Sequence, residues 1–113
     1  MKIENRKKSV TRLLFIKRRW RDAILSGEKT IELRDAKRYS STSIGDEFLL
    51  NGRERIRVIG IKKVYPVEIL ANRELMRASG FRDAEDASRT FADCGIDENS
   101  VLVAFWVAVL NGK

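Results

Sequence analysis

The sequence predicts an α+β protein: one small sheet of about five or six strands, curved or closed into a β-barrel, with short flanking helices. Three observations predict this class. The 113 residues are the length of one ordinary domain. The apolar fraction of 43% is enough for one core. The apolar patterning gives a strand, a helix, several strands, short helices and a last strand, in that order.

The N-terminal part predicts a basic arm, a strand and a helix. Residues 1–10 are charged throughout and are predicted to form a flexible arm. The apolar run 13–16 suits a buried strand. Residues 17–25 carry apolar side chains at helical spacing, at Trp20, Ala23 and Ile24. Gly27 ends this helix, because glycine readily adopts the left-handed conformation of a helix terminus.

A second strand and a polar loop follow. Residues 30–34 alternate between two faces, with Ile31 and Leu33 on one and Thr30, Glu32 and Arg34 on the other. Alternation with this period is typical of a half-buried strand. Residues 35–43 are polar, with four hydroxyl side chains in their second half, and predict a loop.

The middle of the chain predicts a β-hairpin. A short strand over residues 48–50 is followed by Asn51 and Gly52, a pair that favours a tight hairpin turn. The returning segment, residues 56–65, is rich in β-branched side chains, and Pro66 marks its limit.

The last third predicts helices and a final strand. From Glu68 the apolar spacing is helical up to a stop at Gly80. Asp83 is placed to cap a second short helix. Residues 100–110 are apolar almost throughout, which predicts a central strand covered on both faces. With no internal repeat, residues 11–113 are predicted to form a single domain.

Composition excludes several classes of protein. The longest apolar run has ten residues, too short to span a bilayer, and the charged N-terminus does not resemble a secretory signal. A single cysteine, Cys94, forms no internal disulfide, which favours the reducing cytoplasm. The absence of histidine excludes histidine-dependent catalysis and the usual zinc sites. We expect no metal, no cofactor and no membrane partner.

The positive charge is concentrated near the N-terminus. Residues 1–21 hold nine of the 23 Lys and Arg side chains and one acid, a net charge of +8. The rest of the chain is close to neutral, so a polyanion such as RNA or single-stranded DNA is the expected partner. The alternative is a solvated tail that only aids solubility. The predicted backbone-contacting residues are Lys2, Arg6, Lys7, Lys8, Lys17, Arg18, Arg19 and Arg21.

Chemically informative side chains gather just after the predicted helix. Glu32 and Arg34 share a strand face, so they are able to pair, and Lys29 stands at the strand entry. Two cations and a carboxylate suit a base or nucleotide, because arginine supplies a planar fork and glutamate accepts from an exocyclic amine. The alternative is an exposed ion-pair cluster without function.

The same stretch resembles the signature of the ASCH family, glycine-any-lysine-any-any-glutamate-any-arginine. All four positions match, at Gly27, Lys29, Glu32 and Arg34. Gly45 and Asp46 resemble the family's next turn, and Gly80 with Phe81 resembles its late glycine-phenylalanine step. The resemblance covers residues 15–106, almost everything except the basic arm.

The resemblance implies a PUA-like β-barrel with a cleft, associated in that family with RNA or nucleotide binding. Gly27, Lys29, Glu32 and Arg34 would line the cleft. Three residues of the following loop, Lys37, Arg38 and Tyr39, are further ligand-binding candidates because they suit a phosphate or a stacked base.

The resemblance also leaves catalysis open, because some small ASCH proteins are acetylcytidine amidohydrolases and others are reported ribonucleases. Lys29 matches the catalytic lysine of the amidohydrolase branch. The branch's threonine position is Glu32 here, and its glutamate position falls near Ser79. A lysine base also needs a lowered pKa, which burial favours and Glu32 opposes. A binding module is therefore the preferred interpretation, with a hydrolase and a protein-interaction adaptor as alternatives.

Overall fold

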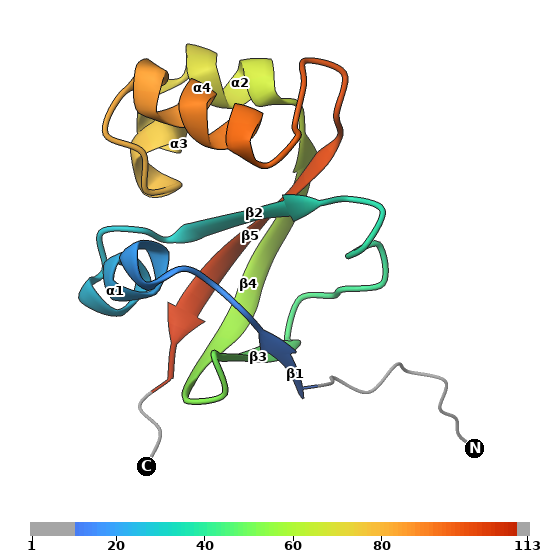
Figure 1. Cartoon of the computed structure of the whole chain (residues 1–113). Coiled ribbons are helices and arrows are strands. Elements are labelled where there is room, and N and C mark those ends of the chain that lie inside the picture. Colours follow the sequence, from blue (N-terminus) through green and yellow to red (C-terminus); the bar gives the residue numbers. More distant parts are fainter. Residues whose placement is uncertain (1–10, 111–113) are drawn as a thin grey trace.

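The computed structural model describes residues 11–110, which form one five-stranded sheet and four helices (Figure 1). The strands are β1 (Thr11–Leu14), β2 (Ile31–Asp35), β3 (Glu47–Leu50), β4 (Glu54–Val64) and β5 (Leu102–Val109). The helices are α1 (Arg18–Ser26), α2 (Pro66–Ala71), α3 (Arg73–Ala78) and α4 (Ala84–Asp93). The α+β class predicted from the sequence is confirmed.

The strands lie in the order β1-β3-β4-β5-β2, and the sheet curls into a half-barrel of the PUA-like kind. β1 and β3 are parallel, whereas every other neighbouring pair is antiparallel. The long strands β4 and β5 form the middle, and a bulge between Val58 and Gly60 shifts their register. Bulges of this kind bend a strand and increase its twist, which helps the sheet to curl.

Local sequence signals explain most turns and helix ends. The β3–β4 turn has positive φ at Asn51 (51°) and Gly52 (79°), as the asparagine-glycine pair predicts. Gly27 ends α1 with a φ of 90° and donates its N–H to the carbonyl oxygen of Ile24. Asp83 caps α4 by accepting from the backbone N–H of Asp86 at 2.8 Å.

Two apolar clusters lie on opposite faces of β5, which places this strand at the centre of the molecule. Val103, Phe105 and Val107 pack into a cluster inside the curl of the sheet. Leu102 and Ala104 pack into a second cluster, to which α2, α3 and α4 contribute. The prediction of a central strand covered on both faces is therefore confirmed.

The structure differs from the sequence prediction at two elements. The first strand is β1 and not residues 13–16, and in this run only Leu14 is buried, whereas Leu13 and Phe15 are 53% and 71% exposed. The helical segment after Pro66 is two short helices, because Asn72 is extended and its side chain accepts from Leu75 N to start α3. The predicted arm, residues 1–10, lies outside the described residues. No helix in residues 11–110 is long and apolar enough to cross a membrane.

Candidate functional site

A cleft of about 660 Å³ opens between α1 and β2 on one side and α4 on the other. Its walls also include the segment before α1, the loop after β2 and the link from α3 to α4. Seven lining side chains are Lys or Arg and four are Asp or Glu, so the walls carry a net positive charge. Its volume lies in the range of small-molecule sites, which is about 300–1,000 Å³.

Glu32 stands between two cations on the β2 wall of this cleft. Its Oε2 accepts from Arg34 Nε at 2.6 Å, and its Oε1 lies 3.3 Å from Lys29 Nζ. Glu32 is 5% exposed and Lys29 is 4% exposed, so the trio is not an exposed surface cluster. The predicted pairing of Glu32 with Arg34 is confirmed, and all three side chains line the same cleft.

Lys29 is buried, and its side chain links β2 to the end of α3 by hydrogen bonds. Its Nζ donates to the carbonyl oxygens of Ile31 (2.7 Å) and Ser79 (2.6 Å) and also faces Glu32. Burial lowers the pKa of Lys29 below its ordinary value, while the carboxylate of Glu32 opposes this shift. Three acceptors surround the nitrogen, which favours a fully donating ammonium over a free amine.

Arg34 presents its guanidinium at the mouth of the cleft. Besides Glu32, it donates through Nη2 to the carbonyl oxygen of Phe15 at 3.1 Å, which links the β2 edge to the segment after β1. Its Cζ lies 5.9 Å from the centroid of the Tyr39 ring. Nη1 has no hydrogen-bond partner among the described residues, so an oriented donor remains for a ligand.

Aromatic side chains line the cleft alongside the cations. Trp20 packs edge-on against Phe81 at 5.4 Å between ring centroids, and Arg19 Cζ lies 3.9 Å from the centroid of the Trp20 ring. Phe15 lines the cleft while 71% exposed, a position suited to stacking on a flat ligand. Trp20, which the sequence places on the apolar face of the first helix, is partly buried and lines the cleft as well.

Asp86, on α4, forms ion pairs with two arginines that line the cleft, Arg19 and Arg82. One oxygen pairs with Arg19 Nη2, and the other lies 3.6 Å from Arg82 Nη2. The backbone N–H of Arg82 also donates to Asp86 at 2.9 Å. Burial alone would raise the pKa of Asp86, but the hydrogen bonds from Arg19 and Arg82 outweigh it and lower the pKa to about 2.

The structure separates the predicted site residues into three groups. Those that line the cleft are Lys17, Arg19, Lys29, Glu32, Arg34, Arg38 and Tyr39. Four described residues do not line it: Gly27 and Lys37 are exposed, Arg18 lies near Asp22, and Arg21 pairs with Glu54. Lys2, Arg6, Lys7 and Lys8 lie outside the described residues. Gly27, predicted to line the cleft, instead ends α1, so its place in the signature is conformational.

Several cleft residues were not predicted as site residues, among them Arg82, Phe15 and Ser79. Arg82 and Phe15 carry no local signal, because the contacts that bring them to the cleft join segments far apart in the sequence. Ser79 lies near the position at which the amidohydrolase branch has its glutamate. It is fully buried and lines the cleft, and its Oγ has no hydrogen-bond partner among the described residues. Thr30, the other hydroxyl near Lys29, is exposed and does not line the cleft.

Together these features define a small PUA-like α+β protein with a basic, aromatic-lined cleft. No family model and no curated protein matches the sequence.

Solved structures with the same fold include ASCH domains. The hypothetical protein PH0355 superposes with a TM-score of 0.70 at 20% identity, covering 89% of this chain and 99% of that one. An ASCH domain from Lactobacillus crispatus gives a TM-score of 0.59 at 19% identity, covering 89% and 79%. The ASCH protein from Zymomonas mobilis gives 0.63 at 14% identity, covering 85% and 65%. The chain therefore has the fold of ASCH domains, which confirms the resemblance at the level of the fold.

Proposed function

We propose that the protein binds single-stranded RNA or a nucleotide in the cleft. The observation that carries this proposal is the fixed guanidinium of Arg34, held by the buried carboxylate of Glu32 at 2.6 Å in a cleft of about 660 Å³. A buried carboxylate that orients an arginine prepares a planar donor fork without losing side-chain entropy on binding. The fold of ASCH domains agrees with the proposal without deciding it.

The surroundings of Arg34 suit a base joined to a phosphate. The Tyr39 ring lies 5.9 Å from the guanidinium, and Phe15 lines the same cleft with an exposed side chain. Stacking on such a ring is worth about 1–3 kcal/mol per base. Arg38 is exposed on the adjoining loop and supplies a mobile cation for a phosphate. Lys29 has its donors occupied, so it supports the wall and is not the main ligand contact.

Two neighbouring loop residues give a matched test. Arg38 lines the cleft and Lys37 does not, although both are exposed cations. We expect Arg38→Ala to weaken RNA binding about three- to tenfold, Arg34→Ala to weaken it tenfold or more, and Lys37→Ala to change it less than about twofold. The measurement is the dissociation constant for a fluorescein-labelled single-stranded RNA, by fluorescence anisotropy at 50 and 200 mM salt.

Binding to RNA that is indifferent to Arg34→Ala and Arg38→Ala would contradict a role for the cleft. The same titration with residues 2–8 deleted separates the contribution of the basic arm, whose loss is expected to reduce the salt dependence. RNA binding that is absent from the intact protein, together with a protein partner unaffected by Arg34→Ala, would favour the adaptor alternative.

A hydrolase is the second candidate, and one observation favours it. Lys29, with its pKa lowered by burial, donates to the backbone of Ser79, whose buried hydroxyl has no hydrogen-bond partner within residues 11–110. A neutral lysine beside a serine hydroxyl is a known nucleophile and base combination. The three acceptors around Lys29 argue against the neutral form, and this is why binding is preferred.

Incubation with acetylcytidine and with end-labelled RNA tests hydrolysis directly. We expect no turnover above the protein-free rate. If the intact protein turns the substrate over and Ser79→Ala does not, at an unchanged melting temperature, hydrolysis would replace binding as the preferred function. Ser79→Ala suits this purpose because it removes a hydroxyl that makes no hydrogen bond to any residue the structure describes.

A further inference from the structure

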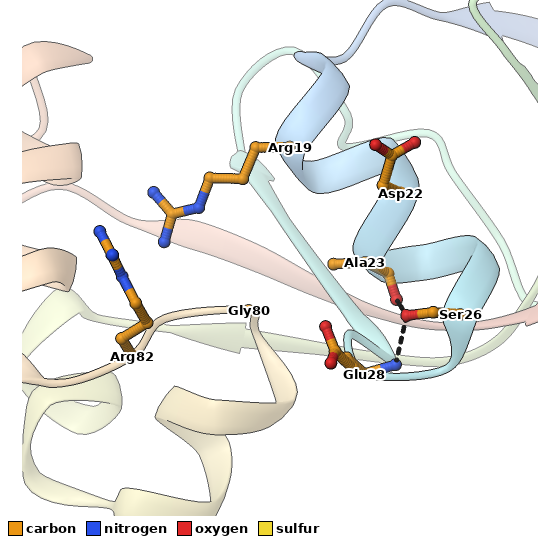
Figure 2. A pocket seen from close by; sticks show the side chains of 7 residues that line it. All are labelled: Arg19, Asp22, Ala23, Ser26, Glu28, Gly80 and Arg82. Atoms are coloured by element: carbon orange, nitrogen blue, oxygen red, sulfur yellow. Dashed lines mark hydrogen bonds between the residues drawn. The ribbon is translucent and has the colours of Figure 1, made fainter.

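A second hollow of about 570 Å³ adjoins the cleft (Figure 2). It lies between α1, the turn after α1, and the link from α3 to α4. Two of its lining residues, Ala23 and Gly80, are small, while Asp22 and Glu28 contribute carboxylates. A hydrogen bond from the backbone N–H of Glu28 to Ser26 Oγ at 3.3 Å orders the turn on one side of this hollow.

Two arginines are shared by the cleft and the second hollow. Arg19 and Arg82 line both. Figure 2 shows their guanidinium groups extending toward one another from α1 and from the segment after Gly80. The two side chains therefore stand where the two hollows meet.

The charge at this meeting point is incompletely balanced. Arg19 and Arg82 share one carboxylate, that of Asp86, which is 5% exposed and leaves one unit of positive charge on the group of three. Arg19 is held further by the Trp20 ring, so its guanidinium is fixed in position. Arg82 has a side chain that is 75% exposed, which leaves most of its donors open to solvent.

We propose that Arg19 and Arg82 bind the phosphodiester between two nucleotides, one in the cleft and the next in the second hollow. This inference rests on the proposed function and narrows its ligand class to a single-stranded RNA of at least two nucleotides. Two guanidiniums that share one carboxylate and carry one excess charge match a single phosphate in charge and in hydrogen-bond donors. Asp86 is a positioning residue that acts through both arginines.

The walls of the second hollow fit the nucleoside part of that neighbour. Asp22 and Glu28 offer acceptors for a ribose hydroxyl or an exocyclic amine, while the small residues Ala23 and Gly80 leave room for a ring. These carboxylates disfavour a second phosphate in this hollow, which places the phosphate at the arginine end.

A comparison of ligand lengths tests this inference. The probes are uridine, the dinucleotide UpU and an eight-nucleotide oligouridylate, with the adenosine series alongside, in competition against a labelled octamer. We expect the dinucleotide to bind about tenfold or more tightly than the nucleoside. Arg82→Ala is expected to weaken binding of the dinucleotide and the octamer about tenfold, to weaken binding of the nucleoside by less than about twofold, and to reduce the salt slope for the octamer by about 0.7.

The variant is chosen so that folding and function are separable. Arg82→Ala keeps the backbone N–H that holds Asp86, so the cleft keeps its shape. Arg73→Ala on α3, an exposed arginine that lines neither hollow, is the matched control and is expected to leave all affinities within twofold. Equal affinity for nucleoside and dinucleotide, or an octamer affinity unaffected by Arg82→Ala, would overturn this inference while leaving the cleft proposal intact. No binding of any probe by the intact protein would overturn both.

Discussion

Replacing Glu32 by glutamine is expected to lower the free energy of unfolding at pH 7 by about 3–5 kcal/mol, because it leaves the buried ammonium of Lys29 without a counter-charge. Glutamine keeps the shape of the side chain and an acceptor for Arg34, so the change isolates the charge. The two cations that lose their partner are 4% exposed at Lys29 and largely covered at Arg34. Urea denaturation followed by tryptophan fluorescence measures the effect.

Glu54→Gln is the matched control for this variant. Glu54 pairs with Arg21, but that pair lies nearer to solvent, so its loss is expected to change stability by less than about 1 kcal/mol. A loss for Glu32→Gln no larger than that of the control would mean that the trio is solvated, and the preorganised guanidinium at the centre of the binding proposal would then lose its support.

The loss of stability in Glu32→Gln is also expected to become smaller as the pH rises. Burial already lowers the pKa of Lys29 from its ordinary value of 10.5, and removing the opposing carboxylate lowers it further. The unfolded chain then binds more protons than the folded one, so stability rises with pH between the folded pKa and about 10.5. Because each pH unit is worth about 1.4 kcal/mol, the gap to the unaltered protein is expected to narrow measurably from pH 7 to pH 9.

Replacing Gly80 by alanine is expected to lower the free energy of unfolding by about 2–5 kcal/mol. Gly80 has a φ of 96°, and a Cβ there would lie 2.8 Å from Trp20 Cζ3 and 3.0 Å from Lys29 Cδ. The unfavourable backbone conformation costs about 1–2 kcal/mol. The clash, which forces the side chains of Trp20 and Lys29 to move, adds about 1–3 kcal/mol. Chemical denaturation gives the loss, and the altered position of Trp20 is expected to weaken RNA binding in the anisotropy assay.

Gly27→Ala separates the cost of the backbone conformation from the cost of the clash. Gly27 has nearly the same φ, 90°, but no atom of residues 11–110 outside its own neighbours lies within 4 Å of the position that a Cβ would take. It is therefore expected to lose only the conformational part, about 1–2 kcal/mol. If both variants lose the same amount, the close approach of α1 to the link after α3 is wrong, and with it the packing that forms one side of the cleft.

The sequence determined the local features of this protein. The asparagine-glycine turn, the glycine that ends α1, the aspartate that caps α4 and the pairing of Glu32 with Arg34 all depend on residues within a few positions of one another. The apolar run of the last strand predicted its central place, because only a strand covered on both faces tolerates so few polar side chains. Backbone preferences and side-chain periodicity act over such short spans, so a pattern is enough to predict them.

Only the tertiary structure decided what the cleft is made of. Lys29 bonds the carbonyl oxygen of Ser79, fifty positions away, and Asp86 gathers Arg19 from α1 and Arg82 from its own segment. Gly27, first in the ASCH-like signature, lies outside the cleft, while Phe15 and Arg82, which are outside the signature, lie inside it. These contacts depend on how the curled sheet sets α1 against α4. The separation of α1 from α4 depends on how the two apolar clusters pack. The spacing of residues along the chain does not determine it.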